Sequence, residues 1–333
     1  MRQFSISTRL GLPSPVWPFV FAALVLFALA ALFVVPFALP LGGPEPRAPS
    51  DLADENGAFA TVDGVTLYYT HLPGDKGPVV LVHGFGGSTV TWNGTMTALA
   101  GAGYEVYAVD LAGYGLSEKG WTIDYRESAQ AARVLGLMDE LGIDQAALVG
   151  HSMGGRVVTL IALAHPECVS GLILAAPALA GQGDGGIPIP GWLLNVSVVR
   201  RWAQIALRQI GPDLVPDLLR DAAYDDAAIT PDLVSGYQRA LDTPGWDLAL
   251  LGITRDGGTS ALPRPLSALA LPVLLVWGAE DTWVPALEGD ALAAALPDTE
   301  YIVLEGTGHL PMHEAPEAFN TALLDFLARW VIG

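Results

Sequence analysis

Six short apolar segments recur along this chain, and they restrict its fold more than any other feature. Each is continuous in Val, Leu, Ile and Ala rather than alternating apolar with polar residues, as expected of a strand buried on both faces. Such strands form parallel sheets that helices cover on both sides. A hairpin around Asp63-Gly64, a strong two-residue turn signal, is expected over residues 58–70. The six segments are 78–83, 105–111, 146–150, 171–175, 272–277 and 301–304.

Longer segments with helical periodicity separate these strands, at residues 92–100, 125–141, 154–164, 287–296 and 316–330. The alternation predicts an α/β fold with a mostly parallel, twisted sheet and helices on both faces. It is interrupted where a Gly/Pro-rich loop leads into helix-like stretches that hold Trp192, Trp202 and Trp246. We therefore expect a core of residues 57–178 and 268–333, with residues 179–267 inserted as a helical cap.

Residues 16–40 contain no charged or strongly polar side chain. About 20 apolar residues suffice to cross a ~30 Å hydrocarbon layer as a helix. A cleaved signal peptide usually has a shorter apolar run and a small-x-small cleavage site, and no convincing site follows Leu41. The sequence favours a retained transmembrane anchor. A cleaved signal and a buried helix of a soluble protein are the alternatives.

The charges around this run predict its orientation. Arg2 and Arg9 precede it, whereas Arg47 follows it among acidic residues. The positive-inside rule then places residues 1–15 in the cytoplasm and the main domain on the extracytoplasmic side. Residues 41–56, rich in Pro, Gly and acidic side chains, are expected to link the membrane to the domain.

The chain is strongly acidic, with 35 acidic against 16 basic residues and a formal net charge of −19. Such a surface repels nucleic-acid phosphates, and no cluster of Lys and Arg stands out, so nucleic acid is not an expected partner. Any contact with a membrane surface is expected to be apolar. The lone Cys168 makes an internal disulfide impossible and is expected to serve as inert packing.

Gly150-His151-Ser152-Met153-Gly154 ends a predicted strand and begins a predicted helix. The motif G-x-S-x-G requires this strand–turn–helix setting. A side chain at either glycine would clash in so tight a turn, and the turn lifts the Ser152 hydroxyl clear of the backbone. We expect Ser152 to be a nucleophile; the alternative is a Gly-rich turn without a chemical role.

A serine nucleophile needs a base and an acid that orients the base. His309 follows the last predicted strand, and Asp281 lies just beyond the strand before it, which gives the chain order serine, acid, histidine. His309 is expected to take the proton from Ser152, and Asp281 to fix the imidazole tautomer. His313 and Glu280 are the rival base and acid.

His83-Gly84-Phe85-Gly86-Gly87-Ser88 directly follows the first of the predicted parallel strands. Its glycine-rich turn can aim backbone N–H groups at one point. We expect the N–H groups of Phe85 and Met153 to form an oxyanion hole, each worth roughly 10²-fold in rate or more.

With Asp110-Leu111-Ala112-Gly113-Tyr114-Gly115-Leu116-Ser117, which is similar to a D-x-x-G-x-G-x-S loop, these units resemble the α/β-hydrolase superfamily. The resemblance covers about residues 57–178 and 270–332. It implies an α/β-hydrolase fold, the catalytic residues Ser152, Asp281 and His309, and no cofactor or metal. Epoxide- and halide-processing relatives carry aspartate where Ser152 stands, so their activities are not expected here.

The resemblance implies acyl transfer to water. The expected function is a membrane-anchored hydrolase that cleaves carboxylic esters of apolar, lipid-like substrates through an acyl-enzyme intermediate, in the manner of carboxylesterases and lipases. A C–C hydrolase acting on diketone-like ring-cleavage products is one alternative. A hydrolase fold reused as a non-catalytic binding module is another.

The expected cap should set substrate choice. Residues 187–199 are apolar and could form a lid on lipid or the cap's own core, and apolar stretches are normally core. Arg200, Arg201 and Arg208 follow at helical spacing and could either meet an anionic substrate or form a solvated face.

Overall fold

The computed structural model describes residues 17–179, 187, 189–257, 261–296 and 298–330. The segment expected in the cytoplasm, residues 1–15, therefore lies outside the described residues. The same is true of residues 180–186, 188 and 258–260 of the expected cap and of residues 331–333 of the expected core.

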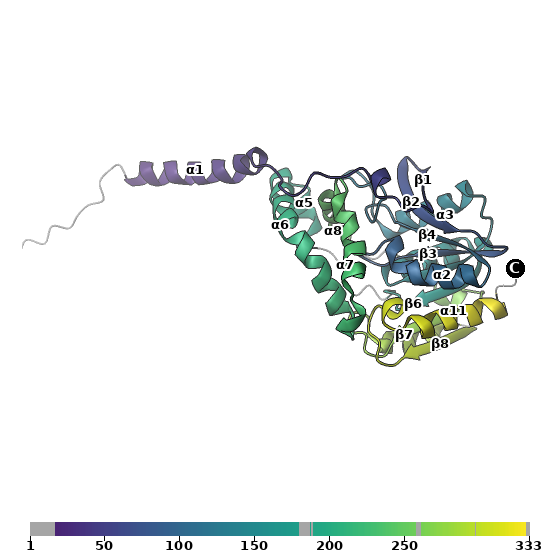
Figure 1. Cartoon of the computed structure of the whole chain (residues 1–333). Coiled ribbons are helices and arrows are strands. Elements are labelled where there is room, and N and C mark those ends of the chain that lie inside the picture. The colour runs from purple at the N-terminus through teal and green to yellow at the C-terminus, as the bar shows by residue number, and fades with distance from the viewer. Residues whose placement is uncertain (1–16, 180–186, 188, 258–260, 297, 331–333) are drawn as a thin grey trace, which may run out of the picture.

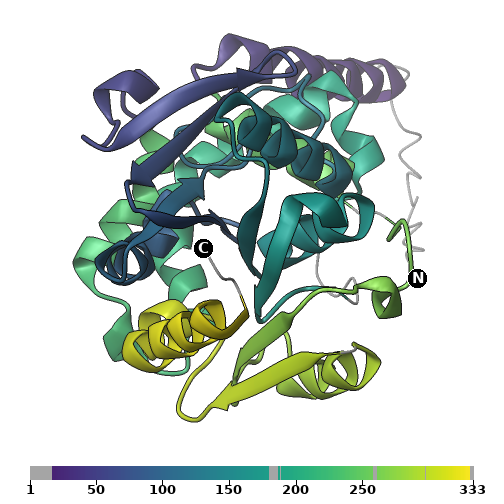
Figure 2. The same ribbon diagram turned by 90° about the vertical axis from the view of Figure 1, so that its right-hand side faces the viewer.

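A twisted eight-stranded sheet forms the centre of the molecule, in the order β1-β2-β4-β3-β5-β6-β7-β8 (Figures 1 and 2). The six strands from β4 to β8 in this order are parallel, and the β1–β2 hairpin joins them antiparallel to β4. This confirms the expected α/β fold with a mostly parallel sheet. The strands are β1 Gly57–Val62, β2 Val65–Leu72, β3 Lys76–Val82, β4 Tyr104–Val109, β5 Ala146–His151, β6 Val169–Ala175, β7 Val273–Gly278 and β8 Thr299–Leu304.

Helices cover both faces of this sheet. On one face lie α3 (Glu127–Glu140), α4 (Met153–Ala164) and α9 (Ala286–Ala295). On the other face lie α2 (Asn93–Gly101) and α11 (Pro316–Trp330), and the short α10 (Pro311–Glu314) precedes α11. The packing follows from helical periodicity: Phe319, Leu323 and Phe326 of α11 share one side and are fully buried. Each such side chain stabilises the fold by about 1.5–3 kcal/mol.

Among the described residues between β6 and β7, four α-helices form a layer beside the sheet (Figure 1). The longest, α6, contains Pro216, whose ring nitrogen cannot donate to the carbonyl of Pro212 one turn earlier. The Gln238 Nε2 group donates to that carbonyl instead, at 2.7 Å, so α6 remains continuous. The four are α5 Gly191–Leu194, α6 Ser197–Ala222, α7 Pro231–Gln238 and α8 Trp246–Asp256, called the cap below.

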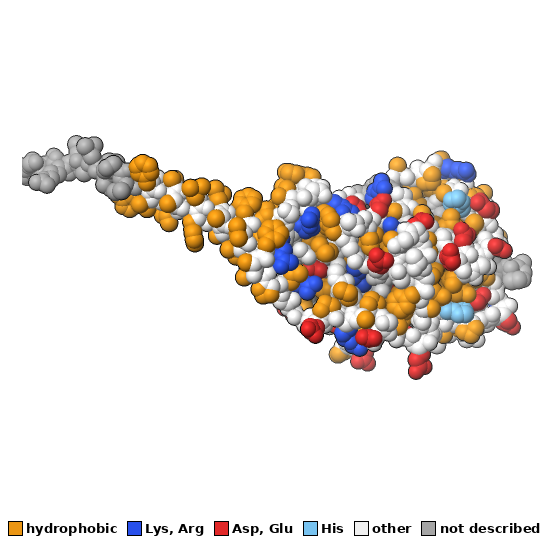
Figure 3. Space-filling model, turned by 90° about the horizontal axis from the view of Figure 1, so that it is seen from above, with side chains coloured by type: hydrophobic (Ala, Val, Ile, Leu, Met, Phe, Trp, Pro, Cys, Tyr) orange, Lys and Arg blue, Asp and Glu red, His pale blue; other side chains and the backbone are white. Residues whose placement is uncertain are grey.

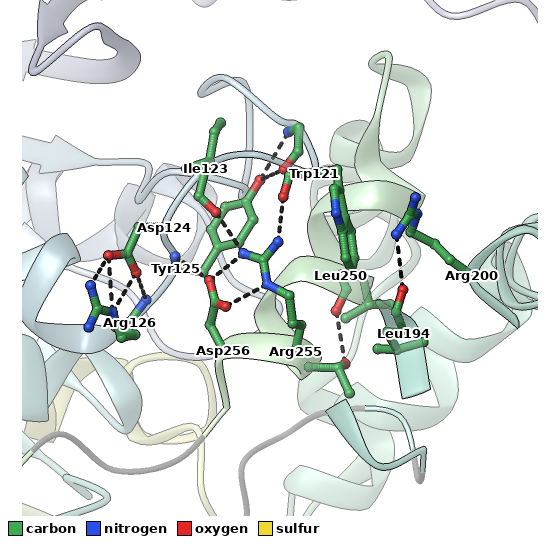
Figure 4. Close-up of polar contacts among 12 residues, drawn as sticks. Trp121, Ile123, Asp124, Tyr125, Arg126, Leu194, Arg200, Leu250, Arg255 and Asp256 are labelled. Atoms are coloured by element: carbon green, nitrogen blue, oxygen red, sulfur yellow. Dashed lines mark hydrogen bonds and ion pairs between the residues drawn. The ribbon is translucent and has the colours of Figure 1, made fainter. Parts of the chain in front are cut away.

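A stacked group of side chains joins the cap to the core (Figure 4). The Trp121 ring lies between two guanidinium groups, 4.2 Å from Arg200 Cζ and 4.5 Å from Arg255 Cζ. Arg255 also pairs with Asp256 at 2.6 Å, and Asp256 accepts a hydrogen bond from the Tyr125 N–H. Cation–π contacts of this kind contribute about 0.5–2 kcal/mol each.

The helix α1 (Trp17–Ala38) extends away from the globular part (Figure 1). It is long and apolar enough to span a membrane, although a signal sequence or a core helix of a soluble protein can have the same length and composition. Pro36 is the one buried residue of this helix. The chain that follows contacts the cap and the core: the Arg47 N–H donates to Asp242 O at 2.7 Å, and Asp54 pairs with Arg239 at 2.8 Å.

Candidate active site

Ser152 lies between the last residue of β5 and the first residue of α4. Its φ of +50° is unusual for a residue with a side chain and indicates local strain. Two backbone hydrogen bonds hold it there: its N–H donates to Ala175 O at 3.0 Å, and its carbonyl accepts from the Ala178 N–H at 3.1 Å. The turn thus fixes the serine in one backbone conformation at the carboxyl end of the sheet.

The two glycines of this turn are required by close backbone approach. A Cβ atom at Gly150 would lie 2.5 Å from the carbonyl oxygen of Gly154. A Cβ atom at Gly154 would overlap the carbonyl oxygen of Val82 in β3. Any larger residue at either position would push α4 away from the sheet.

His309 lies in the loop between β8 and α10, and its Nδ1 atom is 2.7 Å from Asp281 Oδ2. Both side chains are buried, with exposed fractions of 2% and 5%. The other carboxylate oxygen of Asp281 accepts the N–H groups of Trp283 at 2.9 Å and Val284 at 2.8 Å. Asp281 is therefore fixed so that it accepts the Nδ1–H of His309, which leaves Nε2 as the proton acceptor.

Backbone contacts also hold His309 in place. Its N–H donates to Ala222 O at the end of α6, at 2.8 Å. Its carbonyl is 2.8 Å from His151 Nε2. Burial, followed by the proximity of His309, lowers the pKa of His151 well below its usual value. His151 is therefore neutral and donates its Nε2–H to the His309 carbonyl, a role that the motif pattern did not indicate.

Glu314 supports the same loop and was not singled out in the sequence. Its carboxylate accepts the N–H groups on both sides of His309, those of Gly308 and Leu310, at 3.0 Å each. It also accepts the N–H of Tyr224, just beyond α6, at 2.7 Å. One carboxylate thus joins the histidine loop to the cap.

The rival base and acid have other partners. Glu280 Oε2 accepts the Thr307 N–H at 2.9 Å. His313 Nε2 is 3.0 Å from the Tyr237 hydroxyl, and burial lowers the pKa of His313 to about 4. His313 is therefore neutral and hydrogen-bonded to Tyr237, whereas Asp281 and His309 contact each other.

Phe85 and Met153 lie on the two chain segments next to Ser152. The loop after β3 approaches Ser152 so closely that a Cβ atom at Gly84 would lie 3.0 Å from the serine Cβ. Met153 is the first residue of α4, so its N–H has no acceptor within the helix. The loop after β3 and the start of α4 therefore both lie next to the serine.

Buried polar side chains fix the loop that carries Phe85. Burial lowers the pKa of His83, so its neutral ring donates from Nδ1 to Gly84 O at 2.7 Å and accepts the Leu111 N–H on Nε2 at 3.1 Å. Asp110 accepts the Thr89 N–H at 2.6 Å. The D-x-x-G-x-G-x-S segment thus joins the turn after β4 to the loop after β3.

A cavity of about 80 Å³ opens beside Ser152 and His309. Its walls come from the loop after β3 and from the inner side of α6, and most of the side chains are apolar. No Lys or Arg is among the residues that line it, which are Gly84, Phe85, Gly86, Gly87, Thr91, His151, Ser152, Val215, Leu218, Leu219, Ala222, Tyr237, Trp283, His309 and Leu310. Within the described part of the chain, no group of three or more His, Cys, Asp or Glu side chains is placed to hold a metal ion.

Comparison with known proteins identifies the same kind of fold. Residues 77–316 match the family model described as alpha/beta hydrolase fold. An uncharacterized hydrolase, YugF, of Bacillus subtilis is 32% identical over 80% of this chain and 96% of its own length.

Two further relatives have named activities. A 2-hydroxy-6-oxononadienedioate/2-hydroxy-6-oxononatrienedioate hydrolase of Paraburkholderia phymatum is 31% identical over 79% of this chain and 91% of its own length. The solved structure of a thermophilic esterase from Thermogutta terrifontis is similar with a TM-score of 0.65 and 26% identity, over 81% of this chain and 96% of that one.

Proposed function

The chain belongs to the alpha/beta hydrolase family, and we propose that it is a membrane-anchored serine hydrolase that cleaves carboxylic esters of apolar substrates. Ser152, His309 and Asp281 are the proposed catalytic residues, and the N–H groups of Phe85 and Met153 the proposed oxyanion hole. The buried contact of 2.7 Å between His309 and Asp281, on a loop beside Ser152, supports these roles.

In the first half of the reaction, Ser152 Oγ attacks the ester carbonyl carbon while His309 Nε2 takes the hydroxyl proton. Asp281 stabilises the imidazolium that forms. The carbonyl oxygen becomes an oxyanion and is bound by the N–H groups of Phe85 and Met153. The carbon–oxygen bond to the alcohol then breaks, and the alcohol leaves with the proton from His309.

In the second half, water attacks the acyl group on Ser152. His309 takes a proton from this water, and the intermediate is held by the same two N–H groups. When the acyl–serine bond breaks, His309 returns the proton to Ser152 Oγ. The products are a carboxylic acid and the alcohol, so water is the one co-reactant.

The proposal of an apolar ester as the substrate rests on the residues that line the cavity. Leu218, Leu219, Val215 and Leu310 present hydrocarbon to the space beside Ser152, and no Lys or Arg is among its lining residues. An apolar acyl chain gains free energy by leaving water for such a site. A charged substrate group would lose its hydration without gaining an opposite charge.

C–C cleavage is the second candidate, because the Paraburkholderia relative is named as a hydrolase of 2-hydroxy-6-oxononadienedioate and 2-hydroxy-6-oxononatrienedioate. Its substrate is a dioate, so it carries two carboxylates by name. The cavity lining offers no cation to pair with either. This difference favours the ester over the dioate for the present chain.

The anchored location is supported by α1, an uncharged helix of 22 residues. At 1.5 Å per residue it is about 33 Å long, which matches a hydrocarbon layer of ~30 Å. The positions of Arg2 and Arg9 support an extracytoplasmic location for the hydrolase domain.

The test is labelling with a fluorophosphonate probe and turnover of p-nitrophenyl butyrate by the full chain in detergent. Wild type should label and hydrolyse the ester, and Ser152→Ala should do neither. Asp281→Asn should lower kcat by about 10³–10⁴-fold, because the His309 tautomer is no longer fixed. Glu280→Gln, which changes the neighbouring carboxylate, should retain kcat within threefold. A folded wild-type protein that does not label would contradict the proposed function and favour a binding module.

A further inference from the structure

One side of α6 carries an exposed apolar row. Ile210, Leu214 and Leu218 are spaced four residues apart and so share one face of the helix. Their exposed fractions are 49%, 37% and 40%. We call these three residues the α6 stripe. Exposed apolar residues that are contiguous, unlike single ones, indicate a surface that contacts a partner.

Apolar side chains continue from the stripe's helix toward α1. Trp192 in α5 is 71% exposed and Val196, just before α6, is 44% exposed. Figure 3 shows hydrophobic side chains running from α1 onto the adjoining end of the globular part. Tryptophan is enriched where a protein meets the interface of a membrane.

The contact between α1 and α6 is specific, because it satisfies two carbonyls that prolines leave without a donor. Pro36 has no N–H, so the carbonyl of Leu32 lacks its helical partner, and Trp202 Nε1 donates to that carbonyl at 3.0 Å. Pro40 likewise leaves the carbonyl of Pro36 without a donor, and Arg201 Nε donates to it at 2.9 Å.

These bonds fix the direction of the cap relative to α1. In Figure 1, α6 begins beside the end of α1 and runs across it, along the border of the globular part that faces α1. If α1 crosses a bilayer, this border is the one turned toward the lipid surface. Transmembrane helices tilt by about 20° on average, and a tilt in this direction brings α6 closer to the surface.

We propose that the α6 stripe rests on the surface of the bilayer in which α1 is anchored, and that the acyl chain of the substrate enters the cavity from this side. Leu218 belongs to the stripe and also lines the cavity beside Ser152, together with Val215 and Leu219 of the same helix. The side of α6 that faces the lipid therefore adjoins the side that lines the site. This inference rests on the proposed function, since it assumes the anchor and a lipid-like ester.

The contact is apolar and shallow rather than electrostatic. Asp213 and Asp217 are exposed one position before Leu214 and Leu218, so they border the stripe and must stay at the level of the headgroups. The chain as a whole carries a net charge of −19, which does not attract anionic lipid. Binding of the stripe to phosphatidylcholine alone is therefore expected to change little between low and high salt.

The test places an environment-sensitive NBD label on the stripe of the full chain, reconstituted in vesicles of phosphatidylcholine and phosphatidylglycerol. Leu214→Cys is labelled in a Cys168→Ser background. Leu287→Cys is the matched control, because Leu287 in α9 is also an exposed leucine (76%) and lies away from α6. Doxyl-labelled lipids should quench the label at position 214 at least threefold more than the label at position 287.

Equal quenching at the two positions would overturn the proposal. A label at position 214 that is shielded from water but not quenched by lipid, and that loses its shielding when protein is diluted in the vesicles, would assign the stripe to a second copy of the chain. That result also overturns the proposal.

Kinetics separate this inference from the proposed function. The double variant Ile210→Ser, Leu214→Ser should retain kcat/KM for p-nitrophenyl butyrate within twofold, because neither residue lines the cavity. Its turnover of a long-chain ester embedded in the vesicles should fall at least fivefold, whereas Leu287→Ser should not change it. If both substrates are turned over as by wild type, the stripe has no role in access. If wild type hydrolyses neither substrate, the proposed function itself fails.

Discussion

Among single residues, Glu314 joins the His309 loop to the chain just beyond α6. It accepts N–H groups on both sides of His309, and those of Tyr224 and Asp225 beyond α6, the last at 3.3 Å. The N–H groups of Gly308 and Leu310 are partly buried, and a buried unpaired N–H costs about 1–3 kcal/mol. Glu314 is therefore a positioning residue for His309 rather than a participant in proton transfer.

Replacing Glu314 by Gln should lower kcat for p-nitrophenyl butyrate by about tenfold or more with little change in KM. The amide keeps one acceptor oxygen but turns an NH₂ group toward backbone donors, so the His309 loop shifts. Steady-state kinetics measure kcat and KM separately, and Glu314→Asp should recover part of kcat. Glu317→Gln, an exposed acid on α11, is the control. A variant with a lower melting temperature but unchanged kcat would show a purely structural role.

The site residues differ in how far the sequence could indicate them. Ser152 was placed by a motif whose glycines have a local reason, the close approach of backbone atoms. Asp281 and Glu280 are adjacent, and chain order alone favoured Asp281; the structure shows that Asp281 faces His309 while Glu280 bonds the backbone. No motif indicates Glu314: its contacts with Gly308 and Leu310 depend on the conformation of the loop, and its partner Tyr224 is 90 positions away.

At the level of elements, prolines recur at positions where a side chain from elsewhere replaces the missing donor. Trp202 and Arg201 of α6 serve the carbonyls freed by Pro36 and Pro40 at the end of α1. In each case a helix end that would lose hydrogen bonds is joined to a second element. The α1–α6 joint is thus a set of directed bonds as well as apolar packing.

Trp202→Phe should loosen this joint, because phenylalanine keeps an aromatic ring but has no N–H for the Leu32 carbonyl. Spin labels on Phe27→Cys in α1 and Gln209→Cys in α6, in a Cys168→Ser background, report the distance between the helices. The distance distribution in vesicles should broaden for Trp202→Phe. Trp192→Phe, which alters an exposed tryptophan outside the joint, should leave it narrow. Equal widths in all three proteins would contradict a directed joint.

The extent of most elements followed from local sequence, but their order in the sheet did not. The strand expected at 146–150 runs Ala146–His151, and the helix expected at 154–164 runs Met153–Ala164. Continuous apolar runs and helical periodicity suffice for such boundaries. That β4 lies between β2 and β3 depends on pairing between distant strands, for which the sequence held no signal. The bonds between α1 and α6 are non-local in the same way.

At the scale of the whole molecule, three buried histidines are held neutral. Burial lowers the pKa of His83, His151 and His313, the last to about 4. When the chain unfolds, these side chains regain a pKa near the ordinary value of about 6.5. At a pH between the lowered pKa of the folded histidines and the ordinary pKa, the unfolded chain binds more protons than the folded one. The free energy of unfolding therefore falls as the pH falls.

The melting temperature in detergent should therefore decrease steadily from pH 7 to pH 4. His313→Gln should reduce the decrease, because His313 alone accounts for on the order of 3 kcal/mol over this range. Thermal unfolding followed by circular dichroism at several pH values measures the slope of melting temperature against pH for wild type and for His313→Gln. His165→Gln, which replaces an exposed histidine, is the control. A slope for His313→Gln as steep as that of wild type would contradict this account.

The bonds at the two ends of α6 have a consequence for how the rate depends on concentration. One end is tied to α1 and the other, through the Ala222 carbonyl, to the loop of His309. With α1 in a bilayer, the serine stays at one height above the lipid and cannot follow substrate into bulk water. The reaction is then confined to two dimensions. Its rate follows the mole fraction of ester in the surface around each enzyme, and inert lipid added at constant total ester slows it by dilution.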